Sequence, residues 1–357
     1  MTGAAPPRRA GVVGLGLIGG SLGLALRARG WHVSGHDTDA ARVADALRRG
    51  VIDAEGLDPD AEITFVATPV AEIPEAAKAA LAAGPGLVTD VGGVKAPIAA
   101  AIDDRRFLGG HPMAGSELHG LDGADADMFS GAVWVLTPTP ATDDAVFARV
   151  ASVVSSLGTE VVALPPERHD ALVAVVSHVP HLTAATLMAL ADERSSEHAA
   201  LLRLAAGGFR DMTRIAAGPP AIWPDICAQN RTAIVETLDG LIDGLGRMRA
   251  LVDEDDRAGL LATLTSARTA RANLPGRVAR PDEVAEVRVP IPDRPGAAAE
   301  VFTLAAELGV NIADFEVYHS AEGQKGVMLL LIDATNGELF RGGLMARGFR
   351  PNVRPLT

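Results

Sequence analysis

The chain has 357 residues, of which 48% are hydrophobic and 22% charged, a composition typical of a soluble protein with two or three domains. Its formal net charge of -13 argues against a nucleic-acid or anionic-membrane partner, because both favour a basic face. The single cysteine, Cys227, excludes an intramolecular disulfide and a cysteine-based metal cluster. The N-terminus lacks the apolar run of a signal peptide, and no run of about 18 apolar residues appears, so we expect a cytoplasmic protein.

Residues 1–165 predict an α/β Rossmann-type domain that binds a dinucleotide. A strand over 10–13 runs into the G-x-G-x-x-G loop of residues 14–19, a helix follows over 22–28, and a strand over 32–35 ends at Asp37. Such a loop alone is weak evidence, but this one lies between a strand and a helix and precedes an acidic residue. The glycines let a pyrophosphate approach the helix N-terminus, while Asp37 would accept hydrogen bonds from ribose hydroxyls and repel a 2′-phosphate. We therefore predict NAD as the cofactor, bound by Gly14, Gly16, Leu17, Ile18, Gly19 and Asp37.

The α/β alternation continues along the rest of this domain. Further strands are expected over 63–67, 87–90, 107–109, 133–136 and 160–163, with helices over 74–83 and 143–157. Ligands of open α/β sheets lie at the carboxyl ends of the strands. The loops that contain Thr68, Pro69, Gly92 and His111 should therefore share one crevice with the Gly14 loop, and we predict that Thr68, Pro69 and Gly92 also bind the cofactor.

The stretch GGHPMAGSE, residues 109–117, is the strongest candidate for the chemistry. It places an imidazole (His111), a hydroxyl (Ser116) and a carboxylate (Glu117) where the preceding strand is expected to end. An imidazole has an ordinary pKa near 6.5 and can act as a general base at neutral pH. We expect the other segments to bring cofactor and substrate to this loop.

Residues 166–275 predict an all-α domain, because no strand pattern appears there. Arg210 and Arg214 are four apart, so both fall on one helix face, where they could hold an anionic ligand. His178 and His181 are three apart, but no third ligand lies at a suitable spacing, so no metal site is predicted. His169 could line the active-site cleft. The apolar face of residues 222–245 predicts a homodimer, with packing inside one chain as the competing explanation.

The C-terminal segment reads as a linker, 276–282, followed by a small separate module, 283–357. Its expected order is strand 284–291, helix 297–308, strand 311–318, strand 326–332, helix 337–345 and strand 349–353. This βαββαβ order is that of a ferredoxin-like fold.

With these motifs in place, the chain resembles prephenate dehydrogenases of the TyrA family that carry a C-terminal ACT regulatory domain. The motifs are GLGLIGGSL, DVGGVK, GGHPMAGSE, SHVPH, GFRDMTRIA and DRPGAAAEV, and they span nearly the whole chain. The resemblance implies oxidative decarboxylation of prephenate, with hydride passing to NAD and the ring aromatising to 4-hydroxyphenylpyruvate.

The resemblance also implies a role for individual residues. His111 matches the catalytic histidine that takes the proton of the ring hydroxyl, and Arg214 matches the arginine that holds a substrate carboxylate. Arg210 and Asp170 match a cation–acid pair near the entrance. Other pocket positions are matched by Ser116, Glu117, His181 and Trp223, with Glu117 positioning Arg214. The family usually has serine in the middle of DVGSVK, where this chain has Gly93.

The ACT-like tail implies regulation by tyrosine or another aromatic amino acid. The matching effector positions are Arg294 and Gly296 in the turn before a helix, and Asn311 and Ile312 at the start of a strand.

Three other functions compete with this one. Arogenate dehydrogenase uses the same motifs on a substrate with an amino group in place of the keto group. β-Hydroxyacid dehydrogenases need a lysine in the helical domain, and none lies between Lys95 and Lys325. A non-catalytic protein that responds to NAD or an amino acid would not need the set of His111, Ser116, Glu117 and Arg214.

Overall fold

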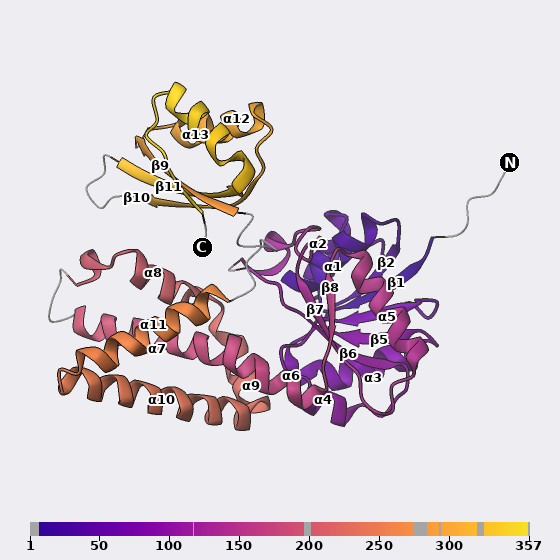
Figure 1. Ribbon diagram of the computed structural model, residues 1–357. Coiled ribbons are helices and arrows are strands. Elements are labelled where there is room, and N and C mark those ends of the chain that lie inside the picture. Colours follow the sequence, from indigo (N-terminus) through magenta and orange to yellow (C-terminus); the bar gives the residue numbers. More distant parts are fainter. Residues whose placement is uncertain are drawn as a thin grey trace. The chain divides into compact units, whose positions relative to one another are not determined.

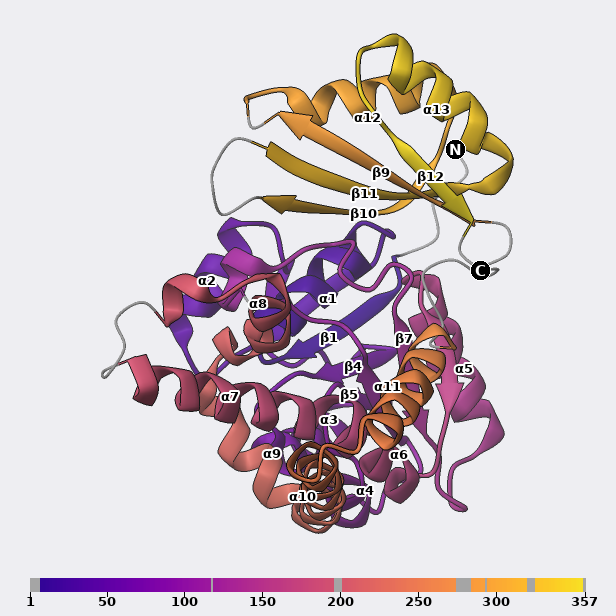
Figure 2. The same cartoon turned by 60° about the vertical axis from the view of Figure 1, so that its left-hand side comes forward.

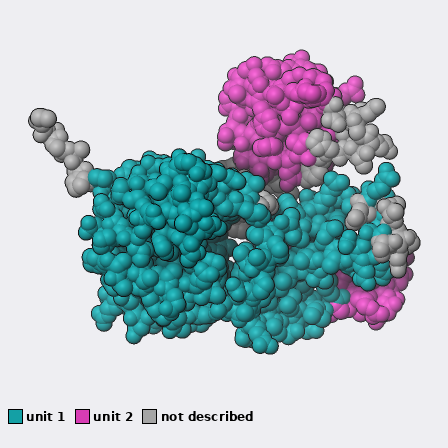
Figure 3. Space-filling view, turned by 180° about the vertical axis from the view of Figure 1, so that it is seen from behind, with its two compact units in different colours: residues 1–245 teal, residues 246–357 magenta. Residues whose placement is uncertain are grey.

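The computed structural model describes residues 7–116, 118–195, 201–273, 284–292, 294–319 and 325–355 (Figure 1). Contacts divide the chain into two compact units, residues 1–245 and 246–357, which Figure 3 shows in different colours. The division falls inside helix α10 (Arg231–Asp253). Each unit is described by itself below.

The first unit is built on an eight-stranded sheet with the order β3-β2-β1-β4-β5-β6-β7-β8. The strands are β1 (Arg9–Val13), β2 (His32–His36), β3 (Ala54–Glu55), β4 (Ile63–Val66), β5 (Leu87–Asp90), β6 (Phe107–Pro112), β7 (Val133–Thr137) and β8 (Glu160–Ala163). All pairs are parallel except β6 with β7. The strand order reverses between β1 and β4, and this switch point is where open α/β sheets bind ligands. The sheet therefore confirms the predicted Rossmann-type fold.

Helices cover both faces of this sheet, so its central strands are buried on both sides, and all four residues of β4 are buried. One face packs against α1 (Leu17–Arg27), α2 (Ala40–Arg48) and α5 (Asp144–Ser156), and the other against α3 (Ile73–Ala83) and α4 (Ala96–Ala101). Helix α1 contributes Leu22, Ala25 and Leu26, which recur at helical spacing and are fully buried. Removing one such side chain, as in Leu22→Ala, typically costs about 2–5 kcal/mol.

Strand β6 corrects the prediction that His111 follows a strand. The strand runs on to Pro112, and His111 pairs with Val135 of β7. The Gly-Gly pair hides this extension, since glycine weakens a strand pattern. Here glycine is needed, because a Cβ on Gly110 would lie 2.8 Å from the Asp90 carbonyl oxygen and 2.9 Å from Trp134 Nε1. His111 is thus held by a paired strand, which fixes its position more firmly than a loop would.

The rest of the first unit is helical, and no strand lies between residues 166 and 245 in the part that the structure describes, as predicted. The helices are α6 (Pro166–Val173), a π-helical turn η3 (Ala174–His178), α7 (Val179–Ser195), α8 (Gly207–Thr213), α9 (Trp223–Gln229) and the first part of α10. The stretch Pro166–Ser195 is long and apolar enough to cross a membrane by length and composition. It also buries His169, Asp170 and His178 in polar contacts, so we interpret it as the central helix of a globular segment.

The second unit ends in a four-stranded antiparallel sheet with the order β10-β11-β9-β12. After α11 (Arg257–Ala272) come β9 (Val284–Pro292), α12 (Ala297–Glu307), β10 (Ile312–His319), β11 (Lys325–Asp333), α13 (Gly337–Ala346) and β12 (Asn352–Pro355). Figure 2 shows α12 and α13 on one face of this sheet. Alternate β9 residues Val287 and Val289 face the helices and are fully buried. The predicted βαββαβ order is confirmed.

Candidate active site

The loop after β1 has the shape that a bound dinucleotide requires. Gly14 has φ +90°, and a Cβ there would lie 2.6 Å from the Ala67 carbonyl oxygen and 2.9 Å from Thr68 N. A Cβ on Gly19 would collide with the Gly14 carbonyl oxygen, whereas Gly16 has nothing within 4 Å. The loop is therefore tight against β4 on one side and open at Gly16, where the helix α1 begins.

Two polar features beside this loop fit NAD. Thr68 Oγ1 is buried and has no hydrogen-bond partner among the described residues, so it can bond to a cofactor. Asp37 accepts the N–H groups of Leu15 at 2.8 Å and Asp39 at 2.9 Å and lies beside Arg42. Burial would raise the pKa of Asp37, but these hydrogen bonds and Arg42 lower it overall. The carboxylate stays ionised where ribose hydroxyls would need acceptors.

The other predicted cofactor residues have different surroundings. Leu17 and Ile18 form the start of α1 and are half-buried, and Pro69 is exposed at the end of the Thr68 loop. Gly92 is buried, and its N–H donates to Asp90 Oδ2 at 2.9 Å. A Cβ on Gly92 would lie 2.6 Å from Ile73 Cδ1, so packing alone explains this glycine.

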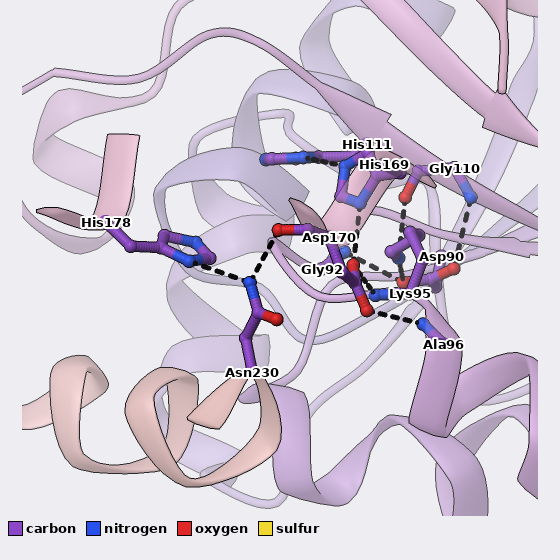
Figure 4. A network of polar contacts seen from close by, with 10 residues as sticks. All are labelled: Asp90, Gly92, Lys95, Ala96, Gly110, His111, His169, Asp170, His178 and Asn230. Carbon is purple, nitrogen blue, oxygen red and sulfur yellow. Dashed lines mark hydrogen bonds and ion pairs between the residues drawn. The ribbon is translucent and has the colours of Figure 1, made fainter. Parts of the chain in front are cut away.

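His111 is the end of a hydrogen-bonded chain that crosses from the sheet into the helical segment (Figure 4). Its Nδ1 lies 2.9 Å from His169 Nε2, and His169 Nδ1 lies 2.8 Å from Asp170 Oδ1. Asp170 also accepts the backbone N–H groups of Lys95 at 2.7 Å and Ala96 at 2.8 Å. Asp170 on α6 therefore caps the start of α4 and fixes the two segments together at the site.

A buried ion pair lies next to His111. Lys95 Nζ contacts Asp90 Oδ2 and donates to the Gly110 carbonyl oxygen at 2.9 Å, and both charged side chains are 0% exposed. Asp90 also accepts the N–H of Gly110 at 3.2 Å. Burial lowers the pKa of Lys95, which the charge of Asp90 partly offsets. These contacts join β5 to β6 at Gly110, the residue directly before His111.

The surroundings of His111 keep its ring neutral. Burial, followed by the charges of His169, Lys95 and His178, lowers the pKa of His111 well below its ordinary value. Burial also lowers the pKa of His178 to about 4. His178 Nδ1 lies 3.2 Å from Asn230 Nδ2, which also donates to the Asp170 carbonyl oxygen at 2.8 Å. A neutral imidazole at position 111 can accept a proton at physiological pH.

His181 and Trp223 form a second cluster in the same unit. Their rings stack with centroids 3.7 Å apart and planes at 15°, and burial lowers the pKa of His181. Trp223 Nε1 is buried without a hydrogen-bond partner in the described part of the chain. Helix α9, which begins at Trp223, packs against residues Val70–Glu72, directly after the Thr68 loop. Val70–Glu72 and the dinucleotide loop follow the carboxyl ends of the neighbouring parallel strands β4 and β1, so α9 lies at the same edge of the sheet as that loop.

The remaining predicted site residues are not joined to His111 by a described contact. Ser116 is exposed, and its hydroxyl accepts the N–H of Leu118 at 3.1 Å. Glu117 lies outside the described residues. Arg214 is exposed and begins a short 3-10 turn, because α8 ends at Thr213. Arg210 is exposed and donates to the Ala205 carbonyl oxygen at 3.3 Å.

The expected pairing of Arg210 with Asp170 is wrong. Asp170 is 5% exposed, and its carboxylate is occupied by His169 and by the backbone of Lys95 and Ala96. Because the Asp170 carboxylate is buried and accepts from three donors, it does not pair with Arg210, which is exposed.

Asp90, Lys95 and Asn230 belong to this network although no role is predicted for them from the sequence, and His169 is predicted only to line the cleft. Asp90 and Lys95 both lie in the DVGGVK motif, and their opposite charges five residues apart were the available signal. His169 and Asp170 are adjacent in sequence, which also points to a polar pair. Nothing in the sequence marks Asn230.

Comparisons with known proteins agree with this geometry. The family model "Prephenate dehydrogenase, nucleotide-binding domain" matches residues 22–163, and "Prephenate dehydrogenase, dimerization domain" matches 165–266. The chain is 32% identical to prephenate dehydrogenase of Bacillus subtilis over 335 residues, covering 89% of this chain and 90% of that protein.

Two solved structures are also similar over about three quarters of the chain. Aquifex aeolicus prephenate dehydrogenase, in complex with hydroxyphenyl propionate and NAD+, has a TM-score of 0.71 and 28% identity, covering 76% of this chain and all of that one. Synechocystis arogenate dehydrogenase has a TM-score of 0.63 and 31% identity, covering 74% and 98%. The chain belongs to the prephenate dehydrogenase family.

Proposed function

We propose that the protein is an NAD-dependent prephenate dehydrogenase, which converts prephenate to 4-hydroxyphenylpyruvate in tyrosine biosynthesis. The observation that carries this proposal is the neutral His111, held on β6 by its Nδ1 contact to His169, in the same unit as the dinucleotide loop. Family membership supplies the substrate class, and the site supplies a base and a place for the cofactor.

In the proposed reaction His111 Nε2 hydrogen-bonds the ring hydroxyl of prephenate and takes its proton. Bound NAD would supply the acceptor for the hydride that leaves the ring carbon bearing this hydroxyl. The ring carboxylate leaves as carbon dioxide, and its bonding electrons complete the aromatic ring. The imidazolium of His111 then returns the proton to the ring oxygen, so the base ends the cycle neutral.

The rest of the substrate pocket is proposed from the family motifs. Arg214 binds a substrate carboxylate, for which its planar guanidinium provides two parallel donors. Arg210, Ser116 and Glu117 lie nearby in this proposal, and the stacked pair of His181 and Trp223 lines the wall. Nε1 of Trp223 supports this assignment, because it is a buried donor without a hydrogen-bond partner among the described residues.

The test is NADH formation by the purified protein with prephenate and NAD, with 4-hydroxyphenylpyruvate identified as the product. The His111→Asn variant should lose this activity while still binding NAD. Absence of NADH formation by the native protein with either prephenate or arogenate would overturn the proposal.

Arogenate dehydrogenase is the second candidate, and its support is the similarity to the Synechocystis enzyme, at 31% identity. The two activities differ in whether the substrate side chain carries a keto or an amino group. Comparing kcat/KM for prephenate and arogenate, each with NAD and with NADP, decides between them.

We also propose a homodimer with a C-terminal ACT-type regulatory domain, working in the cytoplasm. The match to a dimerization domain and the exposed apolar side chains of α10, Val235 (47%) and Ile242 (62%), support the dimer.

The ferredoxin-like order and the left-handed Gly296 (φ +87°) before α12 support the regulatory domain. Arg294, Gly296, Asn311 and Ile312 are the proposed contacts for tyrosine or another aromatic amino acid. Loss of tyrosine inhibition in a chain ending near residue 281, with activity retained, tests this assignment.

A further inference from the structure

The two ring nitrogens of His111 have different surroundings, and these decide which nitrogen carries the proton. Nδ1 faces His169 Nε2 at 2.9 Å. Nε2 and Cε1 lie on the side of Gly93, where a Cβ would be 3.9 Å from each. A base must present an unprotonated nitrogen, so the tautomer of His111 determines whether Nε2 can take a proton.

The tautomer can be followed along the chain from Asp170. Both Asp170 oxygens accept backbone N–H groups, from Lys95 and Ala96, so this carboxylate acts as an acceptor. His169 Nδ1, 2.8 Å from Asp170 Oδ1, must then carry a hydrogen, which leaves Nε2 of the neutral ring as an acceptor. His111 Nδ1 must therefore donate to His169 Nε2, and the lone pair of His111 falls on Nε2.

We propose that His169, oriented by Asp170, is a positioning residue that fixes His111 in the Nδ1–H tautomer and so makes its Nε2 the base. This inference rests on the function proposed above. An acid that orients a histidine through one ring nitrogen while the other does the chemistry is the arrangement of a catalytic triad. Here a second histidine is interposed between the acid and the base.

Burial of His169 and Asp170 favours one arrangement of protons along this chain of contacts. His169 is 0% exposed and Asp170 is 5% exposed, so water does not compete for either nitrogen of His169. The rings of His111 and His169 meet edge to face, with centroids 5.1 Å apart and planes at 72°. Gly93 offers no hydroxyl on the Nε2 side, and the hydrogen bond of the His111 ring among the described residues is the one to His169, which therefore controls the tautomer.

Although burial and the charge of Lys95 lower the pKa of His111, one nearby charge favours its transient protonation. Lys95 of the loop before α4 is matched by Asp90 of β5 in a buried ion pair. Nδ1 of His178, in the π-helical turn, accepts from Asn230 Nδ2, and the pKa of His178 is about 4, so this ring is neutral at physiological pH. The remaining charge in the network is the Asp170 carboxylate, which stabilises an imidazolium through His169.

The first test compares variants at position 169. His169→Leu removes both contacts and should lower kcat by roughly 100-fold or more, with little change in KM for prephenate. His169→Gln can accept from His111 through its carbonyl and donate to Asp170 through its amide, so it should recover about tenfold over His169→Leu. Binding of NAD, measured by titration, serves as the control for folding in both variants.

Asp170→Asn gives a second, shape-preserving test. Asp170 Oδ1 accepts from His169 Nδ1 and Lys95 N, and Oδ2 accepts from Ala96 N, so an asparagine amide must set its own N–H groups against one of these donors. Where the amide nitrogen faces His169 Nδ1, the hydrogen of that ring shifts to Nε2 and the proton of His111 is forced onto its own Nε2. In either orientation the negative charge that stabilises an imidazolium is lost. We expect a fall in kcat of roughly 100- to 10,000-fold. Since Asp170 also caps α4, this result counts only if the thermal unfolding of the variant remains cooperative.

A direct readout uses the native protein with 15N-labelled histidine. The His111 signals are assigned by comparison with His111→Asn. At a pH above the acidic limb of the kcat/KM profile, NMR should find His111 as the Nδ1–H tautomer. An Nε2–H tautomer would overturn the inference, as would native kcat and an unchanged pH profile in His169→Leu. Failure of the native protein to use prephenate or arogenate would instead refute the proposed function, and the NMR measurement would still decide the tautomer.

Discussion

The ammonium group of Lys95 lies 2.9 Å from the carbonyl oxygen of Gly110, the residue directly before His111. Lys95 also pairs with Asp90, so one side chain connects β5, β6 and the loop before α4. The position of the proposed base therefore depends on a buried ion pair.

Lys95→Met should destabilise the protein by about 3–5 kcal/mol, because it leaves the Asp90 carboxylate buried without a cation. The free energy of unfolding from urea titration measures this loss. Lys78→Met is the matched control, since Lys78 pairs with Glu75 at a surface where their side chains are 50% and 82% exposed. Its effect should be below about 0.5 kcal/mol. Equal losses of unfolding free energy in the two variants would show that the buried Lys95–Asp90 pair contributes no more to stability than the exposed Lys78–Glu75 pair.

The local parts of this fold could be predicted from sequence, while the contacts between distant segments could not. Strand β5 was predicted with its observed bounds, because a short apolar run ends in a glycine-rich turn. The extension of β6 to Pro112 depends on pairing with β7, which no local pattern reveals.

The candidate site divides in the same way. The G-x-G-x-x-G loop and His111 were identified from motifs. The hydrogen bond from Lys95 N to Asp170 joins residues 75 positions apart, and no local sequence pattern reveals such a contact. Asp170 was therefore paired with Arg210, which is wrong. The roles of Arg214, Ser116, Glu117 and the effector residues remain predictions.

Asp37→Ser should weaken the binding of NAD and reduce the preference of the protein for NAD over NADP. The substitution removes the acceptor for ribose hydroxyls and frees Arg42, which now lies 3.1 Å from Asp37 and could then bind a 2′-phosphate. We expect KM for NAD to rise by roughly 10-fold, equivalent to about 1.4 kcal/mol, while KM for NADP falls. Asp39→Ser is the control, because Asp39 is also acidic and caps α2 through Ala41 but is 52% exposed. An unchanged NAD to NADP ratio in Asp37→Ser would exclude Asp37 as the selecting residue.

Stability should fall as the pH drops below about 6.5, the ordinary pKa of histidine. His111 and His178 have lowered pKa values in the folded protein, that of His178 being about 4. Between about pH 6.5 and the folded pKa, the unfolded chain binds more protons than the folded one, so protons favour unfolding. Each group adds up to about 1.4 kcal/mol per pH unit to the slope.

Urea titrations at several pH values measure this slope. His178→Gln removes one titrating group and should reduce the slope between pH 6.5 and about 4. His36→Gln, at an exposed histidine, serves as the control and should leave it unchanged. The same slope in native protein and His178→Gln would show that His178 does not titrate in this range.

Gly93→Ser should increase activity, because it places a hydroxyl beside the reacting nitrogen. A Cβ at Gly93 would meet only the His111 ring, at 3.9 Å, so the substitution fits without displacing other described atoms. The hydroxyl could reach His111 Nε2 and the ring hydroxyl of the substrate, and one added hydrogen bond corresponds to a rise in kcat/KM of roughly 2- to 10-fold. Gly93→Ala adds the Cβ without the hydroxyl and is the matched control, expected to leave kcat/KM near the native value. Because the hydroxyl contacts Nε2, the acidic limb of the kcat/KM profile should also move in Gly93→Ser but not in Gly93→Ala. If rate and pH profile are the same in all three proteins, position 93 has no part in the proton transfer.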